Sequence, residues 1–314
     1  MISLFRNCRG GVLSRYVSIV PMCLFLFGIF CVPAFSGIEQ KNFSSPEEAV
    51  EAVIDSIQKN DKDVMLAILG PEGKDLIDSG DPVADRAGRS RFLQEYNEKH
   101  SLKRESADKA VLSVGDDDWP FPIPIVKKLD KWHLDTKAGK EEILNRRIGR
   151  NELNVIEAMK AYWAAQHEYA SKNPSNEYAQ KIVSTKSKKD GLYWETKEGE
   201  EESPLGSLIA KASKAGYSAK KDVKPAPYYG YYYKILTAQG KNAEGGAYDF
   251  IVNGKMILGF ALVAYPAKYG NSGVMTFMIN QQGIVYQKDL GKDTEKTVTD
   301  MTKYDPDRTW QKVD

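Results

Sequence analysis

The chain has 314 residues, 42% of them hydrophobic, and its 44 lysines and arginines nearly balance its 43 aspartates and glutamates. This length allows one large or two ordinary domains, and the interspersed charges give no basic stripe of the kind that binds nucleic acid. All three cysteines lie in the first 36 residues, so the rest of the chain excludes thiol catalysis, zinc fingers and iron–sulfur clusters.

The first 36 residues have the pattern of an export signal. Three arginines precede an uncharged, strongly apolar run over residues 16–37, and Ala34 and Ser36 are the small residues that a signal peptidase needs. We predict a cleaved signal peptide over residues 1–36. A retained anchor is the alternative, because 22 uncharged residues can just span a bilayer. The mature chain is then periplasmic or secreted and meets a membrane only through the signal before cleavage.

Residues 37–142 are predicted to form an N-terminal α+β domain. Ser45, Pro46 and Glu48 form a capping box ahead of an apolar helical face, so a helix should begin at Pro46. The pattern predicts further helices and then strands, at residues 61–70, 85–99, 111–114, 119–126 and 131–136. The prolines in 119–126 favour an edge strand, because proline donates no ladder hydrogen bond.

This order of elements resembles the cone-shaped domains of the nuclear-transport-factor-like group. The resemblance implies a helix-plus-curved-sheet module with a cavity between helices and sheet. It assigns no ligand, because a fold by itself does not determine function.

Residues 143–314 are predicted to form a second α+β domain. A basic connector, "NRRIGRNEL", should lead into a long helix over residues 151–172. Strand-like runs separated by glycine turns follow, which predicts that this helix packs on an antiparallel sheet.

Two stretches of this second part carry a family resemblance. The sequences "RRIGRNELNVIEAMKAYWAAQHEYA" and "YPAKYGNSGVMTFMINQQGIVYQKDLG" resemble the family of exported bacterial proteins catalogued as domain of unknown function 2950. The second stretch is also similar to the C-terminal sheet of type II secretion pseudopilins, which implies a pilin-like domain. The short leader and apolar helical extension of true pilins are missing, and the resemblance implies no activity.

The residue types of catalytic sites do not form a recognisable constellation. His100, His133 and His167 are expected at a helix end, in a strand and within a helix, without the partners that a hydrolytic triad requires. The acidic run at residues 116–118 is expected to be a solvated turn. We therefore assign no catalytic residue.

Candidate binding residues lie in the predicted C-terminal sheet. Tyr229 and Tyr231 belong to a tyrosine-rich strand that we expect to offer an aromatic platform, and Tyr269 and Asn271 lie in the adjacent "YPAKYGNSG" loop. Some pseudopilins hold calcium in a C-terminal loop, and this likeness implies Asp289 and Asp293 as its ligands here. Calcium is the one cofactor that these residues suggest.

These observations predict an exported, non-enzymatic binding or interaction module. Its partner is expected to be an envelope protein or a glycan. The alternative is a carboxylate-dependent periplasmic hydrolase acting in a cleft between the two domains. Its general acid and base would come from Glu141 with Glu142 and from Asp190 with Glu195.

Overall fold

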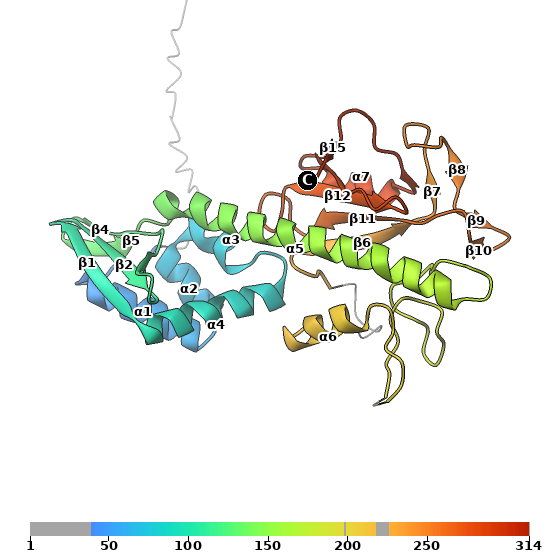
Figure 1. Ribbon diagram of the computed structural model, residues 1–314. Helices are drawn as coiled ribbons and strands as arrows, with labels where there is room; N and C mark the ends of the chain where they lie inside the picture. The colour runs from blue at the N-terminus through green and yellow to red at the C-terminus, as the bar shows by residue number, and fades with distance from the viewer. Residues whose placement is uncertain (1–38, 198, 218–225, 314) are drawn as a thin grey trace, which may run out of the picture. The chain divides into compact units, whose positions relative to one another are not determined.

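The computed structural model describes residues 39–197, 199–217 and 226–313, and the predicted signal peptide lies outside them. The chain is α+β, as the sequence predicts (Figure 1). Its buried apolar residues form two clusters. One cluster spans Phe43 to Leu134 and the other spans Val155 to Tyr304. Within the described ranges, no helix is both long and apolar enough to cross a membrane.

The N-terminal cluster is formed by helices that precede an antiparallel sheet. The helices are α1 (Pro46–Gln58), α2 (Lys62–Leu69), the 3-10 turn η1 (Pro71–Gly73), α3 (Lys74–Ile77) and α4 (Pro82–Glu98). The strands are β1 (His100–Ser106), β2 (Lys109–Val114), β3 (Trp119–Pro120), β4 (Ile125–Lys128) and β5 (Lys131–Leu134). Their order is β1-β2-β4-β5, with β3 paired to β2.

The predicted start of α1 is confirmed. Ser45 is the N-cap, and its Oγ accepts a hydrogen bond from the Glu48 backbone N at 3.1 Å. The Glu48 carboxylate accepts in return from the Ser44 backbone N at 2.8 Å. The first contact satisfies an amide that the first helical turn leaves without a partner, and the second joins the residue before the N-cap to the helix.

The prediction of one edge strand over residues 119–126 is wrong for most of the segment. The structure divides it into β3, which contains Pro120 and pairs with β2 off the main strand order, and β4, which lies between β2 and β5. Pro122 and Pro124 fall in the break between the two strands, where no ladder donor is required. The edge prediction therefore holds for β3 and fails for β4.

The predicted connector before the long helix is also wrong, because α5 (Thr136–Lys172) begins 15 residues earlier than expected. Asp135 caps this helix by accepting from the Ala138 backbone N at 3.3 Å. Gly139 permits its close approach to the sheet, since a Cβ there would lie 2.4 Å from the Pro122 carbonyl oxygen. The first half of α5 thus packs with the N-terminal elements.

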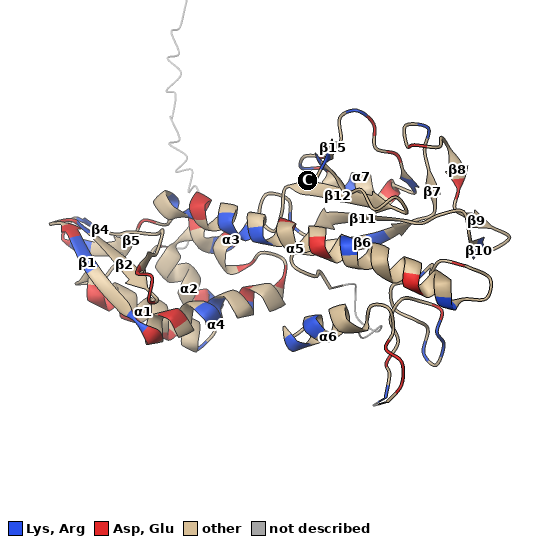
Figure 2. Ribbon diagram, viewed as in Figure 1, with Lys and Arg blue, Asp and Glu red and all other residues tan. Residues whose placement is uncertain are grey.

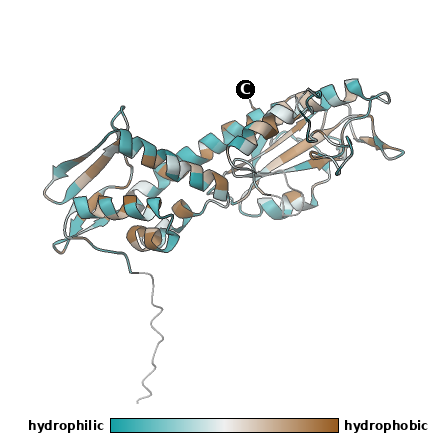
Figure 3. Ribbon diagram, turned by 90° about the horizontal axis from the view of Figure 1, so that it is seen from below, coloured by the Kyte–Doolittle hydropathy of each residue, from teal (hydrophilic) through white to brown (hydrophobic). Residues whose placement is uncertain are grey.

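The second half of α5 packs on the larger sheet, as predicted. Val155, Met159 and Tyr162 are buried against it, whereas Leu153 is 68% exposed. The sheet order is β15-β13-β12-β11-β6, and its central strands β11 and β12 have mainly apolar sequences, in keeping with the brown strands of Figure 3. The sheet strands are β6 (Tyr231–Leu236), β11 (Ala261–Pro266), β12 (Met275–Asn280), β13 (Tyr286–Asp289) and β15 (Gln311–Lys312).

Shorter elements flank this sheet. Asn253 and Gly254 both have positive φ and form the predicted turn of the β9–β10 hairpin. The flanking elements are α6 (Gly206–Lys214), β7 (Ala238–Gln239), β8 (Tyr248–Asp249), β9 (Ile251–Val252), β10 (Lys255–Met256), α7 (Thr294–Asp300) and β14 (Lys303–Tyr304).

A buried carboxylate connects the two clusters. Asp81 is 1% exposed, and its Oδ1 caps α4 by accepting from the Val83 and Ala84 backbone N atoms. Its Oδ2 accepts from the Tyr217 hydroxyl and from the Gly230 backbone N, both at 2.8 Å. Residues 37–314 form one compact unit. A boundary between independent domains at residue 142 stays a prediction.

We expect the Asp81→Ala variant to lose about 3 kcal/mol or more of unfolding free energy. The substitution removes a helix cap and leaves a buried amide and a hydroxyl without an acceptor. Denaturant unfolding followed by tryptophan fluorescence measures the loss. Tyr217→Phe, which removes one of the four contacts, should lose only about 1 kcal/mol. Equal stability of Asp81→Ala and the natural protein would contradict this role.

Candidate ligand-binding cavity

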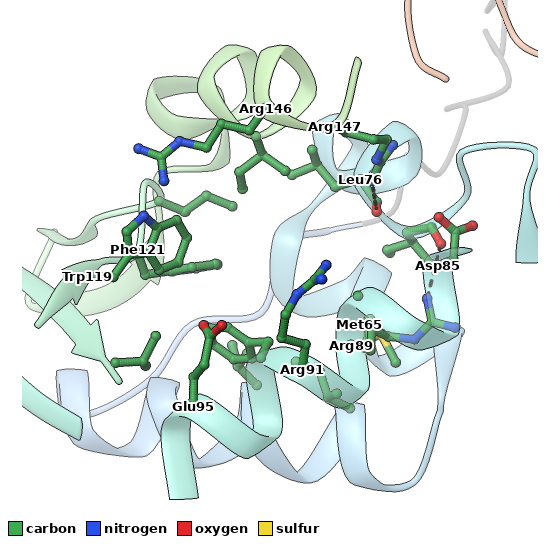
Figure 4. A pocket seen from close by; sticks show the side chains of 18 of the residues that line it. Met65, Leu76, Asp85, Arg89, Arg91, Glu95, Trp119, Phe121, Arg146 and Arg147 are labelled. Atoms are coloured by element: carbon green, nitrogen blue, oxygen red, sulfur yellow. Dashed lines mark hydrogen bonds between the residues drawn. The ribbon is translucent and has the colours of Figure 1, made fainter. Parts of the chain in front are cut away.

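A cavity of about 730 Å³ lies between the helices and the sheet of the N-terminal cluster (Figure 4). A cavity in this position agrees with the expectation from the nuclear-transport-factor-like resemblance, which itself stays a prediction. Its apolar lining comes from α1, α2, the segment before β4 and α5, for example from Val53, Met65, Ile123 and Ile143. The walls are therefore drawn from elements far apart in the sequence.

Aromatic rings form part of this wall. The Phe92 and Phe121 ring centroids are 5.3 Å apart, and those of Trp119 and Phe121 are 6.5 Å apart. The Arg146 guanidinium lies 4.9 Å from the Trp119 ring centroid. Such a wall offers flat apolar area with a cation beside it, which suits an apolar or aromatic ligand.

Residues of both charge signs line the cavity: α4 supplies acids and arginines, α5 supplies arginines, and the turn after β2 supplies acids. Figure 2 shows blue and red segments along α4 and α5. The basic lining residues of the cavity are Arg89, Arg91, Arg146, Arg147 and Arg150, and its acidic ones are Asp85, Glu95, Glu98, Asp116 and Asp117.

Two of these arginines, Arg89 and Arg147, donate hydrogen bonds to backbone carbonyls. Arg89 donates to the Asn60 side chain at 3.1 Å and to the Ile77 carbonyl. Arg147 donates to the Asp75 and Leu76 carbonyls, each at 2.7 Å, and to Asn271 Oδ1. Burial lowers the pKa of Arg147. These hydrogen bonds fix the part of the cavity wall that α3 forms.

Asp85 is a buried acid in the same wall. It is 8% exposed, and its Oδ2 accepts from the Ser79 backbone N at 3.0 Å. Burial raises the pKa of this carboxyl, because the charged form loses hydration. Its backbone hydrogen bond identifies it as part of the wall.

This combination of apolar wall and charged residues is suited to holding a small molecule.

The histidines lie outside this site. None of the three histidines lines the cavity. His100 stacks on Tyr96 with 3.9 Å between ring centroids, His133 lies in β5, and His167 packs beside Trp163. In the part of the chain that the structure describes, no group of three or more histidine, cysteine, aspartate or glutamate side chains is placed to hold a metal ion.

The predicted tyrosine platform is not formed as expected. Tyr231 is fully buried, and its hydroxyl donates to the Met275 carbonyl at 3.0 Å. Tyr229 is partly buried, with its ring 4.5 Å from that of Tyr228 and 5.9 Å from that of Tyr217. Tyr228 and Tyr229 precede β6 and pack against each other and against Tyr217, whereas Tyr231, the first residue of β6, is buried in the core.

The predicted binding loop is occupied by the chain itself. Asn271 is 2% exposed, and its Nδ2 donates to the Asp78 carbonyl at 3.1 Å. Lys268 forms an ion pair with Asp75 at 3.0 Å. Tyr269 is partly buried, and its hydroxyl donates to Asp289 at 3.1 Å. The loop thus joins the two clusters, and the prediction that Asn271 offers an exposed binding group is wrong.

The calcium prediction gains no support from the geometry. Both Asp289 carboxylate oxygens accept hydrogen bonds, Oδ1 from the Gly291 backbone N at 2.7 Å and Oδ2 from Tyr269. Asp293 is exposed before α7, and these two residues are not part of a three-carboxylate cluster among the described residues.

The cavity residues on α4 were missed in the sequence, although a signal was present. Gly88, Arg91 and Glu95 are spaced by three and four positions, so they share one face of the helix. This face also carries Phe92, which makes it mixed and not plainly apolar. From the sequence alone, the polar residues of this face indicate a solvated surface. The structure shows that they line the cavity.

Comparison with known proteins gives one match. The model of a family described as protein of unknown function (DUF2950) matches residues 40–313, most of the chain, and confirms the family resemblance. No curated protein and no solved structure matches. The likeness to pseudopilins stays a prediction.

Burial makes Tyr231 a core residue, so we expect Tyr231→Ser to lower the unfolding free energy by about 3–5 kcal/mol. The sequence alone predicts little change in fold for this variant. Tyr232→Ser is the matched control, because Tyr232 neighbours it on β6 but is only partly buried. Thermal unfolding of both variants measures the difference. Equal losses would contradict the assignment of Tyr231 to the core.

Proposed function

Since the chain belongs to the DUF2950 family, whose description assigns no activity, we propose from the cavity that it is a non-enzymatic binding protein. It encloses a small ligand with a largely apolar body between α4, α5 and the β1–β5 sheet. We therefore propose the cavity as the binding site, in place of the tyrosine-rich strand. We keep export to the cell envelope as part of the proposal, on the basis of the pattern of residues 1–36.

The size and lining of the cavity support this proposal. A volume of about 730 Å³ is within the roughly 300–1,000 Å³ range of small-molecule sites. An apolar body placed there would be removed from water against residues such as Met65 and Phe121, at roughly 25 cal/mol per Å² buried.

The cavity walls are also held in place without a ligand. The Arg147 hydrogen bonds hold α3 to α5, and the N-cap at Asp81 fixes the start of α4. A site that is formed in advance loses less free energy to ordering when it binds.

The hydrolase alternative receives no specific support. None of its candidate acids lines the cavity, and Glu142 is paired with Arg146 at 2.5 Å. Asp190 forms an ion pair with Lys181 at 2.7 Å and accepts from Thr185, and these contacts lower the pKa of its carboxyl. A general acid needs the opposite shift.

A glycine on α4 provides a direct test. Gly88 lines the cavity, and a Cβ added there would meet no atom within 4 Å. Gly88→Leu should therefore fill cavity space without disturbing the fold. We expect it to weaken binding of the neutral fluorescent probe N-phenyl-naphthylamine at least about tenfold, which corresponds to roughly 1.4 kcal/mol.

Gly149→Leu is the matched control. Gly149 is also in a helix with open space around it, but it does not line the cavity. Both variants should be slightly more stable than the natural protein, since leucine favours a helix over glycine by roughly 0.5–1 kcal/mol. Probe affinity is measured by fluorescence titration. An unchanged affinity for Gly88→Leu, or an equal loss for both variants, would exclude the cavity as the binding site.

A further inference from the structure

Two arginines of the cavity differ from the rest in their contacts. Arg91 on α4 and Arg150 on α5 line the cavity, but their guanidinium groups make no hydrogen bond or ion pair with any residue that the structure describes. By contrast, Arg89, Arg146 and Arg147 are each bonded to carbonyl, amide or carboxylate groups. The Arg91 side chain points into the space between α4 and α5 in Figure 4.

The positive charges of Arg91 and Arg150 repel each other. Burial and the charge of Arg91 lower the pKa of Arg150, so two like charges are held near one another. Both residues are exposed enough for their guanidinium groups to reach solvent. Such a pair at a cavity mouth is relieved by an anion that contacts both guanidinium groups.

We propose that Arg91 and Arg150 bind the anionic group of an amphipathic ligand whose apolar body occupies the cavity. This inference rests on the proposed function and specifies the ligand class: a carboxylate or a phosphate ester on an aromatic or alkyl body. The charged group lies at the mouth, where it keeps part of its hydration. The aromatic wall around Phe92 and Phe121 receives the body.

The described acidic lining residues other than Glu95 make no hydrogen bond or ion pair with Arg91 or Arg150. Asp85 accepts from the Ser79 backbone, Glu98 accepts from Gln94, and Asp116 and Asp117 are exposed in the turn after β2. Bonds from neutral donors do not remove a carboxylate's charge, so the local balance depends on the acid that acts on the two arginines. Glu95 acts on Arg150 and offsets part of its charge, but it bonds to neither arginine. One carboxylate facing two guanidinium groups leaves an excess of positive charge.

Two dyes that differ by a single sulfonate test the inference. Anilinonaphthalene sulfonate has the ring system of N-phenyl-naphthylamine with one added anionic group. We expect the natural protein to bind the sulfonated dye about tenfold or more tightly than the neutral one, because charge-assisted hydrogen bonds favour the anion. Raising the salt concentration should reduce this ratio.

Single substitutions assign the preference to its residues. Arg91→Gln and Arg150→Gln should each lower the ratio severalfold and leave binding of the neutral dye nearly unchanged. Arg86→Gln is the matched control, since Arg86 is an exposed arginine of α4 that does not line the cavity. Glu95→Gln should raise the ratio, because it removes the opposing charge.

Displacement of the sulfonated dye distinguishes the two anion types. Decanoate or decyl phosphate should displace it at lower concentration than decanol, and the tighter of the two identifies the anionic group. Equal binding of both dyes by the natural protein, or a ratio that survives both arginine substitutions, would overturn the inference while leaving the cavity proposal intact. Binding of neither dye would overturn both proposals.

Discussion

The continuity of α5 is the constraint on which the rest of the structure depends. One helix supplies Ile143 and Arg147 to the cavity wall and Val155 and Tyr162 to the core beneath the larger sheet. Because its backbone hydrogen bonds run without interruption from Thr136 to Lys172, the two ends cannot be placed independently. Both hydrophobic clusters therefore share one rigid element.

Buried polar contacts reinforce this shared helix. Asp81 and Asn271 are almost completely buried, and each joins residues from both clusters. Burying such groups costs free energy unless all their hydrogen bonds are made, so they favour one arrangement of the clusters over many loosely packed ones. The loop and tyrosine strand that looked available to a partner are used for this internal connection.

The cavity combines a braced wall with an uncompensated charge. Arg147 and Asp85 are fixed by the backbone around α3, whereas Arg91 and Arg150 keep their hydrogen-bonding capacity free of the described residues. Two unpaired guanidinium groups close to each other do not stabilise the fold, because like charges repel. In a binding site the same pair can supply affinity and selectivity for an anion.

The sequence by itself determined the α+β class, the start of α1, the long helix and the strands with their glycine turns, because caps, periodicity and turn residues act over a few neighbouring positions. It also indicated the family, which the family model confirms. Only the tertiary structure decided which polar residues matter. Tyr231 and Asn271 became internal, and Arg91 and Arg150 came to share one cavity. Burial and charge proximity depend on segments that are distant in the sequence, and no local pattern records that distance.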